Sequence, residues 1–363
     1  MAPHRVEQWW LSVVSGERRG VGATAARLLL AGAELPYRFV VGARNRMYDR
    51  AWLASFRSPA TVVSVGNLTV GGTGKTPCVH WLASWLSQQG HRCVILSRGY
   101  GAKRRGAAND ESMELARRLP DVPHLQSPDR VAVARQAVDR LAADVLILDD
   151  GFQHRRLARD VDLVLIDATR PWGWNHLLPR GLLREPPQSL ARADAVIVTR
   201  GRTLAGDAKR KLLQQIDSHH PGIPLAIVSE QPTVWVDGDA NQLPLEGLPG
   251  PLQPVCGIGN PPAFANTLRS VDRSTLPMIV FPDHHAYGRQ DWDRIVTAAG
   301  RHQARAIVCT EKDLVKLAPI AGGELPLWAL RIEWEWLQGR EAIEERLREA
   351  IAGKKAPAPK KRD

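Results

Sequence analysis

A short apolar strand that leads into a glycine-rich loop and then a helix constrains the fold of this chain more than any other feature. The strand covers Thr61–Val65, and the loop that follows, Gly66–Thr76, reads GNLTVGGTGKT. Helical spacing of apolar residues continues over Thr76–Gln89 and stops at Gly90. In such a turn the backbone N–H groups approach phosphate closely, and the helix N-terminus adds partial positive charge. The segment therefore predicts a phosphate-binding loop.

The residues of this loop divide into a backbone cradle and two side chains with separate roles. We expect Lys75 to reach the β- and γ-phosphates of a nucleotide and the Thr76 hydroxyl to bind Mg²⁺. The cradle consists of Gly71, Gly72, Thr73 and Gly74. Thr69 stands where the strict pattern G-x-x-x-x-G-K-[ST] has its first glycine, so the pattern fails at one position. A chance glycine-rich turn is the alternative, and the GKT triplet at a helix start favours the nucleotide site.

A second signal is a pair of aspartates at the end of a fully apolar strand. Val145–Leu148 is followed directly by Asp149 and Asp150. A carboxylate at the carboxyl edge of a strand can hold Mg²⁺ directly or through water. A simple turn could also carry two aspartates, but the apolar strand before them favours a metal site that completes the phosphate loop.

Short apolar runs alternate with helical segments along the rest of the chain. Runs of buried-strand length cover Cys93–Ser97, Leu163–Ile166 and Ala195–Val198. This alternation predicts an α/β fold with a mainly parallel, P-loop NTPase-like sheet. A second, smaller α/β domain follows a Pro/Gly-rich connection. The predicted boundaries are 1–60 for an N-terminal helical segment, 61–228 for the P-loop domain, 229–251 for the connection, 252–351 for the second domain and 352–363 for a disordered basic tail.

The N-terminal segment is predicted to hold an amphipathic helix. Ala23–Leu35 has the pattern of such a helix, with aromatic residues and arginines on either side. A helix of this kind suits a membrane interface, and it equally suits packing on the domain, so the pattern leaves both open. Charged residues and Pro36 interrupt the most apolar stretch, Val21–Ala43, so no spanning helix of about 18 apolar residues is predicted. We also expect no signal peptide, because no apolar segment follows Met1.

Charge and cysteine content narrow the class of protein without selecting a ligand. Lys and Arg number 49 against 38 Asp and Glu, and the net charge of +11 attracts nucleotides, anionic lipids or nucleic acids. The four cysteines are scattered without a CxxC pair, so a reducing cytosol fits better than a disulfide framework or zinc site. A nucleic-acid-binding ATPase would be consistent with the charge, but no zinc finger or aromatic–basic stacking platform supports it, and no nucleic-acid partner is expected.

Six longer strings stand out along the chain. In order they are VGNLTVGGTGKTP at Val65–Pro77, LSRGYG at Leu96–Gly101, DDGFQHR at Asp149–Arg155, LPRGLLREP at Leu178–Pro186, FPDHHAY at Phe281–Tyr287 and TEKDLVK at Thr310–Lys316. Together they resemble the strings of one family, the tetraacyldisaccharide 4′-kinases of lipid A biosynthesis. The resemblance is specific because DDGFQHR and FPDHH are long, unusual strings. It implies transfer of the γ-phosphate of ATP, with Mg²⁺, to the 4′-hydroxyl of a tetraacylated disaccharide 1-phosphate. It also implies two α/β/α domains and peripheral attachment at the cytoplasmic face of the inner membrane.

The resemblance assigns roles to residues beyond the loop. The matching positions are the acidic pair Asp149 and Asp150, the neighbouring His154, the basic residue Arg130 and the Arg-Glu pair Arg184 and Glu185. Each also has a structural alternative, such as a histidine that bonds to backbone or a surface arginine. The resemblance favours a role in the site for each of them.

The predicted catalytic base is Asp110. The family's catalytic carboxylate lies in a Gly-Asp-Glu-Pro string, and the equivalent here, Asn109–Ser112, keeps Asp110 and Glu111 but changes both flanking residues. A positioned base typically contributes about 10²–10⁴-fold in rate. His284 matches the histidine that pairs with this carboxylate, with His285 as its alternative. Because Asp110 and His284 lie on opposite sides of the Pro/Gly-rich connection, we predict a dyad that bridges the two domains.

One other class of protein has a similar loop, the MinD/ParA-like ATPases that dimerise on membranes or DNA. Their signature requires a lysine just before the paired glycines, and Val70 occupies that position here. This departure favours the kinase over the switch ATPase.

Overall fold

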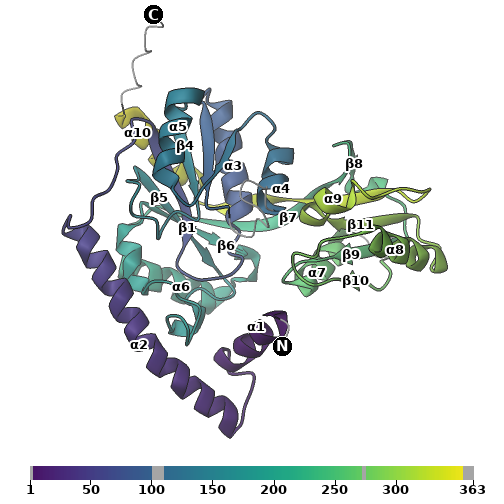
Figure 1. Cartoon of the computed structure of the whole chain (residues 1–363), viewed down its shortest axis with the longest axis horizontal. Helices are drawn as coiled ribbons and strands as arrows, with labels where there is room; N and C mark the ends of the chain where they lie inside the picture. Colours follow the sequence, from purple (N-terminus) through teal and green to yellow (C-terminus); the bar gives the residue numbers. More distant parts are fainter. Residues whose placement is uncertain (1–2, 100–109, 272–274, 355–363) are drawn as a thin grey trace, which may run out of the picture. The chain divides into compact units, whose positions relative to one another are not determined.

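The computed structural model describes residues 3–99, 110–271 and 275–354, which form two compact units (Figure 1). Unit 1 consists of Met1–Tyr100, Leu119–Ser229 and Trp336–Asp363, and unit 2 of Gly101–Arg118 and Glu230–Glu335. The chain thus passes between the units after residues 100, 118, 229 and 335. The passages after 229 and 335 fall inside two strands, β7 (Leu225–Asp237) and β12 (Leu327–Gln338).

This division differs from the predicted boundaries in two segments. Residues 101–118 group with unit 2 rather than with the P-loop domain, and residues from 336 onward group with unit 1 rather than with the second domain. The first difference has a clear physical cause. Helix α4 (Asp110–Arg118) packs on α9 (Glu311–Leu317), where the buried side chain of Arg118 lies 2.9 Å from the buried carboxylate of Glu311.

The sheet of unit 1 is parallel and confirms the predicted α/β, P-loop NTPase-like fold. Its strand order is β7-β6-β5-β1-β4-β2-β3. The strands are β1 (Thr61–Asn67), β2 (Cys93–Ser97), β3 (His124–Gln126), β4 (Val145–Asp149), β5 (Val161–Asp167), β6 (Ala195–Thr199) and the first part of β7. Every residue of central β1 is buried, because helices cover both faces of a parallel sheet.

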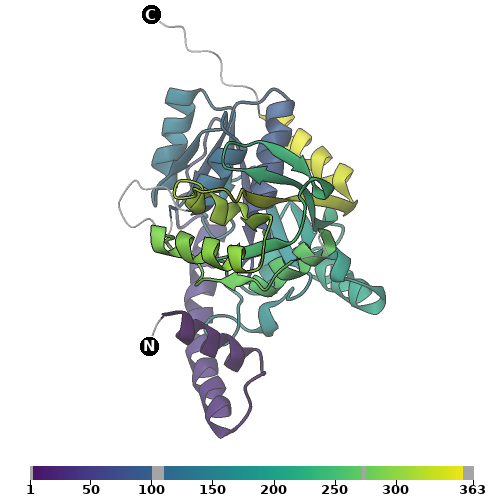
Figure 2. The same ribbon diagram turned by 90° about the vertical axis from the view of Figure 1, so that its right-hand side faces the viewer.

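Four helices of unit 1 cover this sheet. They are α3 (Lys75–Gln88), α5 (Arg130–Leu141), α6 (Gly206–His219) and α10 (Arg340–Gly353). Apolar residues of α5 pack with Val62 and Leu146, and those of α6 pack with Val164 and Val196. Figure 2 shows α5 and α10 on opposite faces of the sheet. Short 3₁₀ turns cover Gly173–Asn175, Pro187–Arg192, Gly201–Thr203 and, in unit 2, Leu245–Gly247.

Unit 2 is a smaller α/β unit, as predicted. Parallel strands follow the order β10-β9-β11-β12, and β8 pairs antiparallel with β7. Its elements are α4, β8 (Gln242–Pro244), β9 (Leu252–Cys256), α7 (Pro261–Val271), β10 (Ile279–Val280), α8 (Arg289–Arg301), β11 (Ala306–Thr310) and α9. Trp292 and Ile295 of α8 are fully buried against the strands. They belong to one of two hydrophobic clusters found among the described residues of this unit.

The N-terminal helix is longer than the sequence pattern predicts. After α1 (Pro3–Val14), α2 runs over Val21–Asp49 and passes through Pro36. A proline inside a helix lacks the N–H donor and crowds the preceding turn, at a cost of about 3 kcal/mol. Buried contacts on both sides of Pro36, at Glu34 and Asn45, offset that cost and keep the helix continuous.

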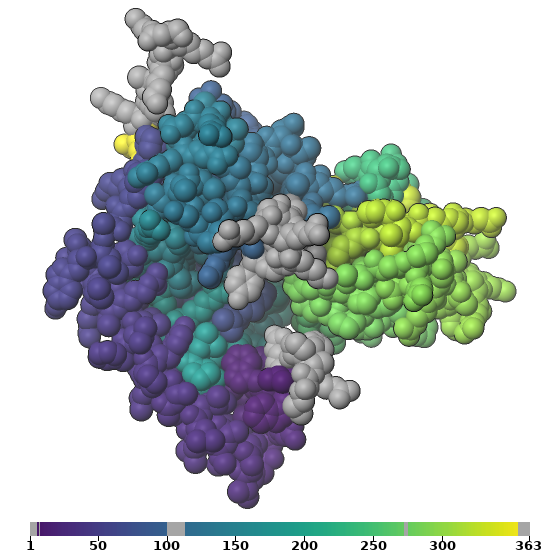
Figure 3. All heavy atoms as spheres, in the orientation of Figure 1, coloured from purple at the N-terminus to yellow at the C-terminus, as the bar shows by residue number. Residues whose placement is uncertain are grey.

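The outward face of α2 is apolar. Its exposed large side chains recur at helical spacing and are Val21, Leu28, Leu29, Leu35, Phe39, Val40 and Met47. Figure 3 shows the side chains of α2 uncovered along this edge of unit 1. Among the helices of the described residues, none is both long enough and apolar enough to cross a bilayer.

Candidate active site

The phosphate-binding loop lies between the end of β1 at Asn67 and the start of α3 at Lys75. Gly71 (φ +109°) and Gly74 (φ +82°) adopt backbone conformations that side chains with a Cβ rarely adopt. A Cβ at Gly71 or Gly72 would meet no atom within 4 Å. Glycine at position 71 is therefore explained by backbone conformation, and space remains beside the loop for a ligand.

Residues at the end of β6 hold the loop from outside. The Thr199 hydroxyl donates to the Thr73 carbonyl at 3.1 Å, and Arg200 Nη2 donates to the Gly72 carbonyl at 2.8 Å. Arg200 is itself paired with Asp167 at the end of β5. These bonds fix two loop carbonyls before a nucleotide arrives, which is pre-organisation. Neither Thr199 nor Arg200 was expected from the sequence, because no local pattern links them to the loop.

Two glycines bring the ends of β1 and β4 close together. A Cβ at Gly66 would lie 2.6 Å from Phe152 Cβ, and one at Gly151 would lie 2.5 Å from the Ser64 hydroxyl. The register pairs Val65 with Asp149, so the acidic pair lies beside the strand that leads into the loop. The close approach of the DDGF turn therefore requires glycine at both positions.

The structure brings three other predicted site residues together around Asp150. Lys75 Nζ lies 3.6 Å from its carboxylate, and Arg184 Nη1 donates to both carboxylate oxygens at 2.9 and 2.8 Å. Arg130 Nη1 donates to the Asp150 carbonyl at 3.3 Å. Burial raises the pKa of the Asp150 carboxyl, but the charges of Lys75, Arg184 and Arg130 together outweigh it, so that the pKa lies below its usual value. The carboxylate is therefore ionised at neutral pH.

Arg130 is a buried cation rather than a surface charge. It is 5% exposed at the start of α5, and its burial lowers the pKa of the guanidinium. Together with Lys75 and Arg184 it gives this end of the sheet a concentrated positive charge, which favours phosphate binding.

His154 lies in the turn after the acidic pair, where its backbone N–H donates to the Gly151 carbonyl at 2.8 Å. Burial, followed by the charge of Arg130 and other arginines, lowers the pKa of His154 to about 4. The imidazole is neutral at pH 7, and its buried Nε2 has no hydrogen-bond partner among the described residues. A neutral ring can accept a hydrogen bond from a ligand hydroxyl.

Among the described residues, Glu185 does not bond to Asp150, unlike its neighbour Arg184. It is 1% exposed and bonds to Arg192 Nη2 and Asn45 Nδ2, each at 2.8 Å. Gln153 supports the site more directly, because Nε2 donates to the Asn67 carbonyl at 2.9 Å and Oε1 accepts from Arg184 at 3.4 Å. Gln153 was not predicted as a site residue, although it lies within the DDGFQHR string.

In unit 2 the structure distinguishes the two adjacent histidines. His285 bonds to Asp291 at 3.0 Å and packs on Phe281 and Tyr287, so it is a structural residue. His284 is in the left-handed region (φ 58°), its side chain is 60% exposed, and its Nε2 lies 3.5 Å from Lys312 Nζ. His284 is therefore the better placed of the two to meet a ligand.

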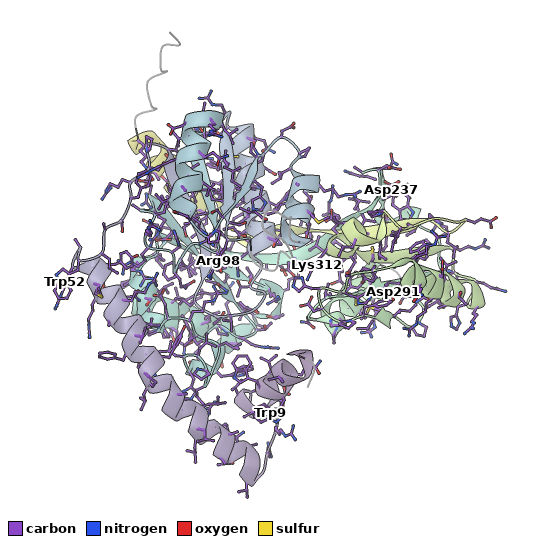
Figure 4. The ribbon with its side chains drawn as sticks, viewed as in Figure 1. Trp9, Trp52, Arg98, Asp237, Asp291 and Lys312 are labelled. Atoms are coloured by element: carbon purple, nitrogen blue, oxygen red, sulfur yellow. The ribbon has the colours of Figure 1, made fainter. Side chains whose placement is uncertain are left out.

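The TEKD string supports the loop that carries His284. Lys312, labelled in Figure 4, bonds to Asp283 at 2.9 Å. Asp313 is fully buried and accepts hydrogen bonds from the Tyr287 hydroxyl at 3.0 Å and the Gly257 N–H at 3.1 Å. The carbonyl of Gly257 in turn accepts from the N–H of His284 at 3.3 Å.

The predicted dyad does not bridge two domains. Asp110 begins α4, and both α4 and His284 belong to unit 2. The side chains of Asp110 and Glu111 lie outside the described residues, as does Asn109. The pairing of Asp110 with His284 remains a prediction.

The oxygen donors near the loop suit a hard divalent cation. In the described part of the chain, His, Cys, Asp and Glu form no group of three or more that could hold a metal ion. Mg²⁺ usually binds through one or two carboxylates plus phosphates and water rather than through an all-protein cage. The ionised Asp150, its neighbour Asp149 and the Thr76 hydroxyl are a fitting donor set for that mode.

Comparison with known proteins gives a consistent result. A family model described as tetraacyldisaccharide-1-P 4′-kinase, LpxK, matches residues 26–352. The tetraacyldisaccharide 4′-kinase of Syntrophus aciditrophicus is 42% identical over an alignment of 332 residues that covers 84% of this chain and 88% of that protein. The same enzyme of Anaeromyxobacter dehalogenans is 39% identical over 357 residues, covering 93% and 92%.

A solved structure also matches. LpxK from Aquifex aeolicus, crystallised in complex with ATP, is 28% identical, with a TM-score of 0.73 over 90% of this chain and 99% of that chain. On the family match, the relatives and the shared fold, this chain belongs to the tetraacyldisaccharide 4′-kinase family.

Proposed function

We propose that this chain transfers the γ-phosphate of ATP to the 4′-hydroxyl of a tetraacyldisaccharide 1-phosphate through the residues gathered around Asp150. Phosphorylation of the 4′ position is the reaction of its family. The observation that carries the proposal is the convergence of Lys75, Arg130 and Arg184 on Asp150 beside the phosphate loop. Phosphoryl transfer depends mostly on positioning and charge stabilisation, which such a cluster supplies.

On the donor side, the amides of Gly71–Thr76 receive the phosphates of ATP. Lys75 lies 3.6 Å from Asp150 and is close enough to exchange that partner for the terminal phosphates. Thr76, Asp149 and Asp150 would hold Mg²⁺. Bound there, the ion supplies neutralisation of charge on the phosphates. Arg184 remains on Asp150 and keeps its carboxylate in place.

On the acceptor side, Asp110 takes the proton of the 4′-hydroxyl. The sugar oxygen forms a bond to the γ-phosphorus while the bond from that phosphorus to the bridging oxygen of ADP breaks, and ADP leaves with the electron pair. His284 orients the carboxylate of Asp110 and tunes its basicity, as a histidine bonded to a carboxylate can.

The apolar face of α2 supports attachment of the enzyme to a membrane surface. An acylated substrate resides in a bilayer, and an exposed apolar helix face with basic residues at one end suits an interface. Arg46 and Arg50 lie at the end of α2, and Trp52, labelled in Figure 4, is 68% exposed. We infer peripheral attachment at the cytoplasmic face of the inner membrane.

The test is transfer of radiolabelled γ-phosphate from ATP to purified tetraacyldisaccharide 1-phosphate in detergent, with Mg²⁺ present. We expect a single label at the 4′ position. Lys75→Ala should lose ATP binding and turnover together, whereas Asp110→Ala should keep ATP binding and lose turnover by about 10²-fold or more. Absence of transfer by folded wild-type protein would refute the proposal.

A further inference from the structure

The inward face of α2 bonds to the segments that form the phosphate-transfer site. The Tyr37 hydroxyl donates to the Arg184 carbonyl at 3.0 Å, and Asn45 Nδ2 donates to Glu185 Oε2 at 2.8 Å. Arg44 Nη2 donates to the Gln153 carbonyl at 2.7 Å. Two positions on one helix, about two turns apart, therefore reach the two strings that carry Arg184 and Gln153.

Each of these contacts is made to Arg184 or Gln153, or to the residue next to Arg184, and both Arg184 and Gln153 support the site. Arg184 bonds directly to both oxygens of Asp150, and Gln153 bonds to Arg184 and to the carbonyl of Asn67 at the start of the loop. Glu185 follows Arg184 in the chain. A shift of α2 away from the sheet of unit 1 would thus release both segments that keep Arg184 on Asp150.

The inward face of α2 is more polar than that of an ordinary amphipathic helix packed on a domain. The outward face of α2 is apolar, whereas its most buried side chains include Glu34 and Asn45, at 4% and 9% exposed. Burying polar groups is costly unless they are hydrogen bonded, and such bonds specify one geometry. A helix that served only as an anchor would need no directional bonds to the residues around Asp150.

We propose that Tyr37 and Asn45 are positioning residues of the kinase, so that α2 is part of the active site as well as its membrane-facing element. The inference rests on the proposed roles of Arg184 and Asp150. Arg44 contributes in the same way through Gln153. Catalysis is sensitive to position, and a misplacement of about 1 Å can reduce the rate about 10²-fold.

The test compares turnover, substrate affinity and membrane binding in two single variants. In detergent micelles, Tyr37→Phe and Asn45→Ala should lower kcat by about 10-fold or more. The KM for the lipid substrate and binding to vesicles of phosphatidylethanolamine and phosphatidylglycerol should stay at the wild-type value. Arg27→Met is the matched control, because Arg27 lies on α2 but donates to the Val13 and Arg18 carbonyls in the α1–α2 hairpin. It should leave kcat unchanged.

A donor–acceptor exchange separates positioning from mere stability. Asn45→Asp places a second carboxylate against Glu185 and should lower kcat further, whereas Asn45→Asp combined with Glu185→Gln restores a hydrogen bond in the opposite direction. We expect the double variant to recover at least part of the kcat lost in Asn45→Asp, at equal Tm. If Asn45→Ala fails to fold, Tyr37→Phe and the exchange decide the matter.

Two outcomes would overturn the inference. Wild-type kcat in folded Tyr37→Phe and Asn45→Ala would show that α2 does not position Arg184. Reduced vesicle binding at normal kcat in micelles would show an anchoring role alone. Failure of the wild-type protein to transfer phosphate would instead refute the proposed function, so the two failures are distinguishable.

Discussion

At the scale of single residues, the site depends on how one partly buried carboxylate is surrounded. Burial raises the pKa of the Asp150 carboxyl, but three neighbouring cations lower it by more. The loss of any one of these cations should therefore raise that pKa. Lys75 and Asp150 could be predicted because each lies at a fixed point in a strand–loop pattern. Thr199, Arg200 and Gln153 could not, since their contacts depend on the order of strands in the sheet rather than on spacing along the chain.

His154 gives a pH-dependent prediction at the same scale. Its pKa is lowered from 6.5 to about 4 in the folded protein, mainly by burial. Between these values the unfolded chain binds more protons than the folded one, so the free energy of unfolding decreases as pH falls from 6.5 to about 4. His154→Asn removes this contribution, and the Tm of the variant should fall less than that of the wild type across the interval. Parallel curves of Tm against pH would contradict this assignment.

At the scale of elements, α2 shows what pattern reading captures and what it omits. The apolar repeat predicted an amphipathic helix over Ala23–Leu35, whereas the helix in the structure runs on through Pro36. The helix continues to Asp49 because its inward side chains, Tyr37 and Asn45 among them, find partners more than 100 residues away. Such long-range contacts override local helix propensity and cannot be read from a window of sequence.

The outward face of α2 should determine membrane binding. Leu28 and Phe39 are 69% and 75% exposed, and full burial of a side chain of this kind contributes about 1.5–3 kcal/mol. We expect Leu28→Ser and Phe39→Ser each to weaken binding to phosphatidylethanolamine–phosphatidylglycerol vesicles by about 10-fold, as measured by co-sedimentation.

The matched control for this prediction is Val280→Ser. Val280 is an exposed apolar residue, 53% exposed, that belongs to β10 of unit 2 rather than to α2. It should leave vesicle binding at the wild-type value. Equal losses in all three variants would mean that general surface hydrophobicity, and not this helix, controls the interaction.

At the scale of the whole molecule, the chain does not divide into consecutive domains. Residues 101–118 interrupt the sequence of unit 1 but belong to unit 2, and residues 336–363 follow unit 2 in the sequence but belong to unit 1. The Pro/Gly-rich stretch suggested a single connection, yet the passages after residues 229 and 335 run through β7 and β12. A change in composition indicates a loop, but it does not indicate which sheet a later strand joins. The fold class could therefore be predicted from the sequence, whereas the boundaries between the two units could not.

Net charge gives the last prediction, because it acts on the molecule as a whole. The chain carries +11, and each Lys or Arg near an anionic bilayer contributes about 1 kcal/mol at ordinary ionic strength. The Debye length falls from about 10 Å at 0.1 M salt to about 3 Å at 1 M, so this part of the attraction should vanish. Binding to vesicles rich in phosphatidylglycerol should therefore weaken with salt. Weaker binding to pure phosphatidylcholine vesicles, which we expect to depend on the apolar face of α2, should persist. Salt-independent binding to both would show that charge has no part in attachment, and loss of both at high salt would show that α2 does not insert.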